Sequence, residues 1–374
     1  MPNQYVFSKQ LIDSLIGGVA AIDVKRLRIQ NLNESYEFIN AYGYNLNNEK
    51  DRALLWNFHR RAVTFIREEL LNENEEIPEA LTDPNQLNDL AYLLIYASTQ
   101  DKKTYSMQYW SCAILRVMHV LVHLENDMFL QYSTEIQDQV LKPFYDVKVD
   151  DPLSGGLRFV GKKISAEIRL KKFEAKSFKS LNSSMIKLLV KPEAVAFRIL
   201  DKVGVRIVTR TIFDCYRVLR FLVDENIISF PHIIPSQSTN NIYPSNLFLQ
   251  QMETITANDS LTPEQIDEKL LARLHESQSL AEFQVRENEF SASDYRFIKF
   301  IARRLIDVTS YNEKGEEKQF SFFYPFEVQL MDYATYLNNL SEADHESYKL
   351  RQKKRARLRV FGKPPIDRKE NHND

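Results

Sequence analysis

The sequence predicts an α+β protein, in which a helical N-terminal region precedes a mixed β-sheet that is flanked by helices and interrupted by a helical insertion. Two observations support this class. Residues 51–71 and 104–130 have apolar side chains every three or four positions, which is typical of amphipathic helices. After residue 157, segments rich in β-branched residues alternate with helix-like segments, which favours a sheet covered by helices.

The length of 374 residues exceeds what one hydrophobic core usually organises, so we expect more than one domain. The composition shifts at residues 150–156, DDPLSGG, which we interpret as a linker. We therefore expect a helical domain at 1–150, a sheet domain at 157–340 with an insertion at about 249–290, and a basic C-terminal helix or tail at 341–374.

The elements of the second domain follow from local patterns. Alternation of polar and apolar side chains predicts a strand at 164–173. A short helix is expected next, at 183–190. The further expectations are strands at 199–208, 229–234, 295–308 and 320–330, helices at 213–223 and 261–279, and a basic helix at 349–359.

Charge is distributed unevenly along the chain. Residues 161–220 carry 15 Lys or Arg against 5 Asp or Glu, and residues 351–363 carry 7 basic residues and no acid, although the net charge is −2. A basic band in an otherwise acidic chain favours a polyanionic ligand, such as a polyphosphate or RNA.

The two cysteines, Cys112 and Cys215, lack metal-ligand spacing, and no apolar run is long enough to cross a bilayer. The first residues lack the layout of a secretory signal, so we expect a cytoplasmic protein without a membrane partner.

One basic segment suggests phosphate binding, and one segment that begins with an acid suggests metal binding. In SFKSLNSSMIKL, residues 177–188, Lys179 and Lys187 flank Ser183 near a helix N-terminus, which suits a phosphate or merely a capped helix with solvated lysines. In ILDKVGVRIV, residues 199–208, Asp201 begins an apolar strand that holds Arg206. A carboxylate at a strand end suits Mg²⁺, or it pairs with a neighbouring cation.

Two further segments add an aromatic ring and a second acid. NNIYPSNL, residues 240–247, places Tyr243 in a polar loop, where its ring would stack on a nucleobase or anchor the loop. In YPFEVQL, residues 324–330, Glu327 alternates with apolar residues. A carboxylate in such a strand is costly unless it is paired, metal-bound or solvated.

In this order the segments resemble the RelA/SpoT-type (p)ppGpp synthetases, a nucleotidyltransferase family. FDCYRVL, residues 213–219, is similar to the family's D-C-Y-x-V-L helix. The residues that match its other motifs are Lys179, Ser183, Lys187, Asp201, Gly204, Arg206, Asn241, Tyr243, Ser245, Glu327 and Gln329. Ser177, Leu247 and Met331 stand where the family has arginine, histidine and arginine.

The resemblance implies Mg²⁺-dependent transfer of the β,γ-pyrophosphate of ATP to the 3′-hydroxyl of a guanosine nucleotide. Asp201 and Glu327 would bind the metal, and Glu327 would alternatively take the proton of the attacking hydroxyl. Lys179, Lys187 and Arg206 would hold phosphates, and Tyr243 would stack on the acceptor base. Ser183, Asn241, Ser245 and Gln329 would complete the nucleotide site.

Two alternatives stay open. The same fold modifying tRNA 3′ ends is favoured by the basic stretch 351–363, and a non-catalytic nucleotide-binding module is favoured by the three replaced residues. Retention of both acids favours an enzyme. We expect Lys172, Lys176, Arg303 or Arg304 to replace the missing arginines.

The N-terminal region holds one further pair of interest. His119 and His123 share a helix face, which suits a metal ligand pair or two packed histidines. No His-Asp dipeptide, which marks the hydrolase domain of the bifunctional family members, occurs in the sequence.

Overall fold

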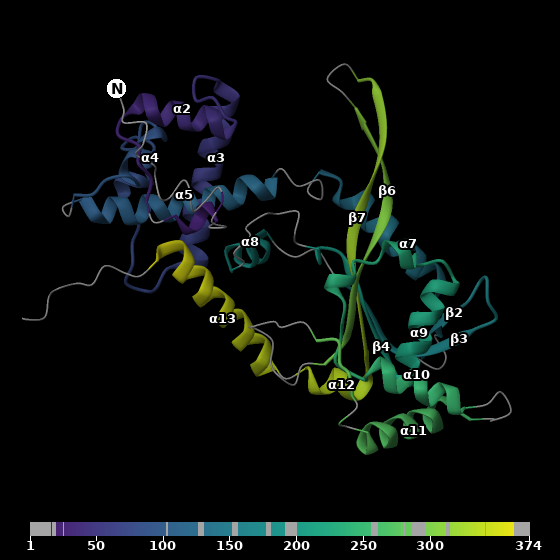
Figure 1. Ribbon diagram of the computed structural model, residues 1–374. Coiled ribbons are helices and arrows are strands. Elements are labelled where there is room, and N and C mark those ends of the chain that lie inside the picture. Colours follow the sequence, from purple (N-terminus) through teal and green to yellow (C-terminus); the bar gives the residue numbers. More distant parts are fainter. Residues whose placement is uncertain are drawn as a thin grey trace, which may run out of the picture. The chain divides into compact units, whose positions relative to one another are not determined.

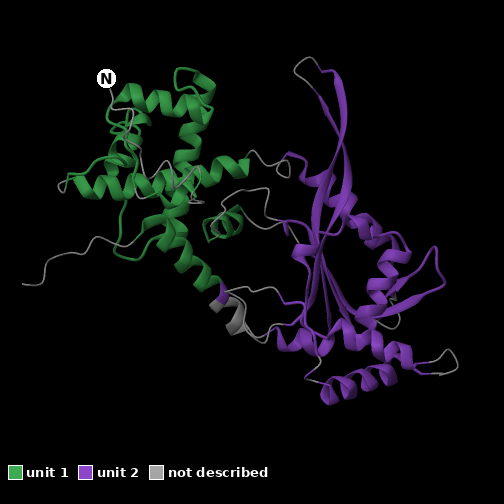
Figure 2. Ribbon diagram, in the orientation of Figure 1, with its two compact units in different colours: residues 1–127, 180–199, 349–374 green, residues 128–179, 200–348 purple. Residues whose placement is uncertain are grey.

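The computed structural model describes residues 16, 20–24, 26–101, 104–125, 131–151, 156–176, 181–190, 200–255, 261–277, 279, 281–285, 296–311, 315–340 and 342–362. The chain forms two compact units, which Figure 2 colours separately. Unit 1 comprises residues 1–127, 180–199 and 349–374, and unit 2 comprises residues 128–179 and 200–348. Within the described residues, we find no helix with the length and apolarity that crossing a bilayer requires.

Unit 1 is built from helices. They are α2 (Leu32–Tyr42), α3 (Glu49–Phe65, continued by a π-helical turn to Leu70), α4 (Ala91–Tyr96), α5 (Tyr105–Glu125), α8 (Leu181–Val190) and most of α13 (Glu342–Phe361). The side chains of Asn31 and Asn48 cap α2 and α3 by accepting backbone N–H groups, which explains where both helices begin. The expected helices at 51–71 and 104–130 are confirmed as far as the structure describes them.

Unit 2 is a mixed α+β structure, which confirms the predicted fold class. Its seven-stranded sheet has the order β1-β2-β3-β4-β7-β6-β5, in which only β4 and β7 are parallel (Figure 1). The strands are β1 (Lys148–Asp151), β2 (Gly156–Val160), β3 (Glu167–Lys176), β4 (Gly204–Thr209), β5 (Thr239–Asn240), β6 (Ile298–Tyr311) and β7 (Glu317–Asp332). The helices are α7 (Ser133–Val147), α9 (Ile212–Asp224), α10 (Ser245–Thr254), α11 (Pro263–Glu276) and α12 (Tyr333–Asn338).

One face of this sheet is apolar and carries the core of unit 2. Helices α7 and α9 pack on it, and their buried stripes recur at helical spacing, as in Ile136, Val140 and Phe144 of α7. From the sheet, Val205, Ile207, Phe326, Val328 and Leu330 join them in one cluster. Because side chains alternate along a strand, the residues between these project from the opposite face.

The helix expected at 261–279 is confirmed as α11, and helix α10 precedes it. Helix α11 begins with a capping box, in which Thr262 and Gln265 satisfy each other's backbone N–H groups. Helix α10 packs on α11, and α11 packs on α9 (Figure 1). The side chain of Asp267 accepts the backbone N–H of Phe213 at 2.8 Å, so the insertion also caps α9.

Two expectations about this architecture do not hold. Residues 229–234 form no strand but lead into 3-10 turns at 230–232 and 235–237, because Pro231 and Pro235 cannot donate backbone hydrogen bonds to a ladder. The compact units also differ from the expected domains. Helix α7, expected in the N-terminal domain, packs on the sheet of unit 2, whereas α8 and most of α13 belong to unit 1.

Candidate functional site

The second face of the unit 2 sheet is polar across four adjacent strands. The register places Glu174 of β3 opposite Arg206 of β4, which lies beside Gln329 of β7. Gln329 in turn lies opposite Lys299 of β6. Residues paired in this way project from the same side of a sheet. We call these four residues, together with Lys172, Lys176 and Glu327, the polar face.

Glu327 is the least exposed acid of the polar face, at 5% of its surface. Its Oε1 atom forms an ion pair with Nζ of Lys176, and its Oε2 atom lies 3.8 Å from Nζ of Lys299. A buried carboxylate without partners would be costly, and here two cations from the strands on either side of the β4–β7 pair provide them. Glu327 is therefore a charged group at the centre of a cation cluster.

Gly204 explains how Glu327 reaches that position. It pairs directly with Glu327, and the backbone N–H of Glu327 donates to the carbonyl of Val203 at 2.9 Å. A Cβ atom at Gly204 would lie 2.6 Å from the Glu327 carbonyl oxygen, closer than real contacts allow. The glycine between Asp201 and Arg206 is thus a packing requirement of this strand pair.

Arg206 connects Gln329 and Glu174, its neighbours on the two adjacent strands of the polar face. Its Nε–H donates to Oε1 of Gln329 at 3.1 Å, and its Nη1–H donates to Oε2 of Glu174 at 3.2 Å. Lys172 pairs with the other oxygen of Glu174 at 2.5 Å and donates to Tyr336 of α12 at 2.7 Å. Partial burial alone would raise the pKa of Glu174, but hydrogen bonds and charges from Lys172 and Arg206 hold it below its usual value.

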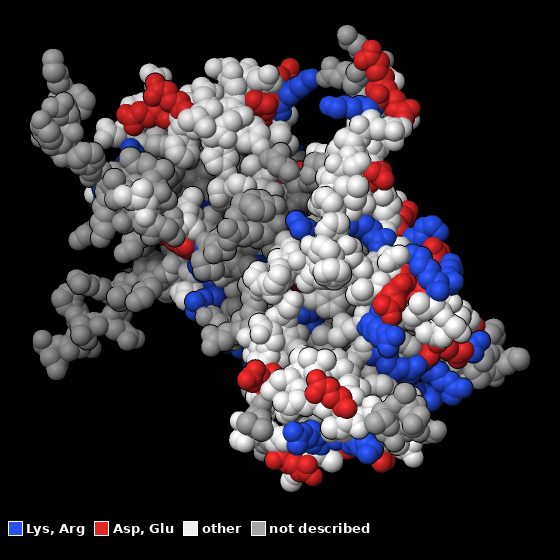
Figure 3. All heavy atoms as spheres, turned by 45° about the vertical axis from the view of Figure 1, so that its right-hand side comes forward, with Lys and Arg blue, Asp and Glu red and all other residues white. Residues whose placement is uncertain are grey.

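The polar face contains four cations against two carboxylates, and most of these side chains remain partly exposed. The exposed fractions are 21% for Lys176, 28% for both Arg206 and Lys299, and 46% for Lys172. Solvent therefore reaches the cations, so an anionic ligand can as well. On the side of the molecule drawn in Figure 3, by contrast, basic and acidic side chains of unit 2 lie intermixed.

Asp201 does not begin strand β4, which corrects one expectation. It lies in a half-buried turn, and ladder pairing starts at Gly204. Strands β4 and β7 are neighbours, and the residue beside Glu327 is Gly204 and not an acid. Among the described residues, no three His, Cys, Asp or Glu side chains are arranged to hold a metal ion.

Tyr243 is a core residue, and this corrects its expected role as a stacking platform. Its ring is fully buried, and its hydroxyl donates to the carbonyl of Leu270 on α11 at 2.9 Å. Burial raises the pKa of Tyr243 to about 12. Asn241 accepts the backbone N–H of Phe297 at 2.6 Å, and Ser245 begins α10. The segment therefore fixes the insertion to the sheet.

The first basic segment lies elsewhere in the fold. Ser183 and Lys187 belong to α8 in unit 1, where Met185, Leu188 and Leu189 are buried in that unit's core. Lys179 and Ser177 lie outside the described residues. The predicted roles of Lys179, Ser183 and Lys187 as phosphate or nucleotide ligands stay predictions.

Two of the three replaced positions, Leu247 and Met331, lie among the described residues and have structural roles. Leu247 and Met331 are buried in the core of unit 2, and Asp332 caps α12 by accepting the N–H groups of Ala334 and Thr335. Of the cations expected to replace the arginines, Lys172 and Lys176 lie on the polar face. Arg304 does not, because it donates to the carbonyls of Gln139 and Ile227 on the helix-covered side.

An exposed aromatic ring lies farther along the polar side of β7. Phe323 is 48% exposed and stands four residues before Glu327, about 13 Å away along an extended strand. The ring of His232 lies 4.8 Å from it, and the guanidinium of Arg303 lies 5.8 Å from its centroid. Sequence reasoning missed Phe323, Glu174 and Lys299, although their alternation with buried residues was a usable signal.

The histidine pair of unit 1 is a packed pair. The rings of His119 and His123 are 4.5 Å apart, and Nδ1 of His119 lies 2.6 Å from the hydroxyl oxygen of Tyr42. His59 of α3 is also buried, with Nε2 2.8 Å from the carbonyl oxygen of Leu81.

No family model and no curated protein matches the chain. Among solved structures, it is similar to small alarmone synthetase 1 from Bacillus subtilis, whose crystal structure holds its product pppGpp. The match covers 64% of this chain and 88% of that chain, with 13% sequence identity and a TM-score of 0.25. A TM-score this low places no ligand and no catalytic residue in the present chain.

Proposed function

We propose that unit 2 is a nucleotidyltransferase that moves the β,γ-pyrophosphate of ATP to the 3′-hydroxyl of a guanosine nucleotide. The observation that supports this most is the position of Glu327, which lies on an open sheet face between Lys176 and Lys299 and next to the Arg206–Gln329 pair. Of these residues, Glu327, Arg206 and Gln329 belong to the motifs that resemble the RelA/SpoT-type family. Phosphoryl-type transfer depends on such positioned charges more than on covalent chemistry.

The residues have separate roles in this proposal. Lys176, Lys299 and Arg206 exchange their intramolecular acid and amide partners for phosphate oxygens, because cations hold phosphates by charge-assisted hydrogen bonds. Glu327 is thereby released to accept the proton of the attacking 3′-hydroxyl. The new bond joins the 3′-oxygen to the β-phosphorus, the bond between the α-β bridging oxygen and the β-phosphorus breaks, and AMP leaves with that oxygen.

A magnesium ion fits this face only together with the substrate. Mg²⁺ is usually held by one or two protein carboxylates plus substrate phosphates, so a cluster of three protein ligands is not required. Glu327 on the polar face and Asp201 in the turn before β4 would hold it. When bound, the ion would neutralise charge on the phosphates.

A nucleobase needs a stacking surface other than Tyr243, whose ring is buried. We assign this role to Phe323, because its exposed ring is flanked by Arg303 and His232 on the polar side of the sheet. Aromatic and guanidinium surfaces stack on any base. The separation between Phe323 and Glu327 suits an extended nucleoside triphosphate.

A non-catalytic nucleotide-binding module is the second candidate. It is favoured by the direct ion pair between Glu327 and Lys176, and by the buried apolar residues Leu247 and Met331 at family ligand positions. The tRNA alternative loses part of its support, because Lys353, Arg357 and Arg359 pair with acids of unit 1.

A transfer assay separates the candidates. The full chain is incubated with γ-labelled ATP, Mg²⁺ and either GDP, GTP or bulk tRNA, and both label transfer and AMP are measured. Label on the guanosine nucleotide supports the proposed function. Label on tRNA shows that the acceptor is tRNA and not a guanosine nucleotide. If ATP binds but no acceptor is labelled, the protein is a binding module.

A further inference from the structure

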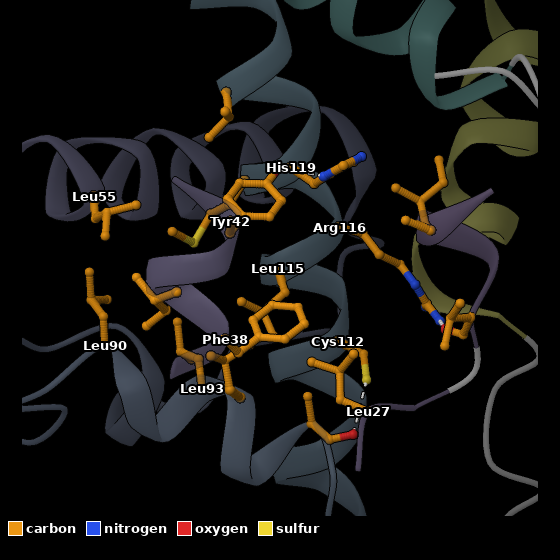
Figure 4. Close-up of a pocket in the computed structure, with 18 of the residues that line it drawn as sticks. Leu27, Phe38, Tyr42, Leu55, Leu90, Leu93, Cys112, Leu115, Arg116 and His119 are labelled. Atoms are coloured by element: carbon orange, nitrogen blue, oxygen red, sulfur yellow. Dashed lines mark hydrogen bonds between the residues drawn. The ribbon is translucent and has the colours of Figure 1, made fainter. Parts of the chain in front are cut away.

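A second site candidate is lined entirely by residues of unit 1. It is a cavity of about 310 Å³ between α2, α4, α5 and the extended segment before α2 (Figure 4). The side chains that define its shape are Leu27, Phe38, Tyr42, Leu93, Leu115 and His119. Its walls are almost wholly apolar, which is typical of sites for small molecules.

The cavity is too large to be a packing defect. Protein interiors are close-packed, with few voids larger than a water molecule, and side chains around a void lose dispersion contacts. Phe38 and Tyr42, one turn apart on α2, leave 43% and 40% of their surfaces exposed although both border the cavity. A bound apolar molecule would restore these contacts and cover both rings.

The volume suits a small molecule. A cavity of roughly 150 Å³ holds one benzene molecule, so about twice that volume suits two fused rings or an alkyl chain of similar size.

One end of the cavity is polar and neutral. The hydroxyl oxygen of Tyr42 lies 2.6 Å from Nδ1 of His119. Burial and the neighbouring His123 lower the pKa of His119 to about 4, and burial and Tyr44 raise the pKa of Tyr42 to about 12. The pair is thus uncharged at neutral pH. The guanidinium of Arg116, also in the wall, already donates to the carbonyls of Val24 and Val360.

We propose that this cavity binds an apolar molecule of about two-ring size that carries one neutral hydroxyl or carbonyl group, hydrogen-bonded to the Tyr42–His119 pair. The apolar body fills the space between Phe38, Leu93 and Leu115, and the polar group fixes its orientation. This site is independent of the polar face of unit 2, so either proposal can fail alone.

Calorimetric titration of the full chain with 2-naphthol and with naphthalene tests the proposal. We expect one molecule per chain at micromolar affinity, with 2-naphthol binding about three- to tenfold more tightly because of its hydroxyl. Tyr42→Phe keeps the ring and should remove this preference. Absence of saturable binding of both probes, or an unchanged preference in Tyr42→Phe, overturns the assignment.

A filling variant provides the second readout. Leu115→Trp should occupy the cavity and abolish binding, whereas Leu54→Trp, an exposed neighbouring position outside the lining, should leave binding unchanged. Circular dichroism establishes that each variant is folded. If Leu115→Trp fails to fold, Tyr42→Phe still decides the question, and full binding by a folded Leu115→Trp contradicts the proposed site.

Discussion

Replacing Gly204 by alanine and by valine tests how closely β4 and β7 approach beside Glu327. An added Cβ would lie 2.6 Å from the Glu327 carbonyl oxygen and 3.0 Å from its Cβ atom. Favourable contacts between carbon and other heavy atoms need about 3.5–4.0 Å, so the strands must separate by up to roughly 1 Å. Such a separation would lengthen and weaken the hydrogen bond from the Glu327 N–H to the Val203 carbonyl.

The expected magnitude follows from two opposing terms. Overpacking costs about 1–3 kcal/mol, and the lower chain entropy of unfolded alanine returns about 0.4–1 kcal/mol. We therefore expect Gly204→Ala to lower the free energy of unfolding by about 1–2 kcal/mol, or the Tm of a domain this size by about 2–8 °C, and Gly204→Val to lower it further.

Thermal unfolding followed by circular dichroism measures both variants, and the order of stabilities is decisive. Intrinsic strand preference ranks valine above alanine and alanine above glycine. If Gly204→Val is the most stable of the three proteins, the close approach of Gly204 to Glu327 is wrong.

Three further predictions concern the insertion and the end of β7. The pKa of Asp267 is raised to about 6 by burial and by the charges of neighbouring aspartates, so its contribution to stability is complete below about pH 4 and is lost as the pH rises through 6. Asp267→Asn should therefore gain Tm over the wild type at pH 7 but not at pH 4, whereas Glu264→Gln, exposed on the same helix, should show no such change. Tyr243→Phe should cost about 0.5–1.5 kcal/mol in urea unfolding by losing its bond to the Leu270 carbonyl, and an unchanged free energy of unfolding would contradict that bond. Asp332→Ala should cost about 0.5–2 kcal/mol by removing the cap of α12, and an unaltered urea midpoint would contradict that role.

Most elements could be predicted because their signals are local. The apolar period of 104–130 and the Thr262–Pro263 start of α11 depend on nearby residues only. The two motif-bearing strands β4 and β7 are neighbours, as the shared metal site implied by the resemblance requires, whereas their parallel direction was not predicted. The assignment of α7 to the sheet could not be, because an amphipathic stripe such as Ile136, Val140 and Phe144 does not specify the core that it joins.

The candidate site was predictable only in part, because its motifs are local whereas the burial of its residues depends on distant segments. Glu327 and Arg206 share the polar face, as the motifs indicated, whereas Tyr243 is buried because α11 covers it. No local pattern distinguishes an exposed loop tyrosine from one that an insertion buries later in the sequence. Asp201 was expected to begin the strand, but it precedes Gly204, where β4 begins. The reason is that β-branched composition does not define where ladder pairing begins.

In the proposed function, Glu327 acts on a nucleotide held by the cations of the polar face. The most direct test of this role compares pyrophosphate transfer from ATP to GDP by the wild type, Glu327→Gln and the exposed control Glu317→Gln, together with ATP affinity. We expect Glu327→Gln to lose at least about 100-fold in rate while ATP affinity changes little, and Glu317→Gln to match the wild type. A Glu327→Gln protein that transfers pyrophosphate at the wild-type rate would contradict the account.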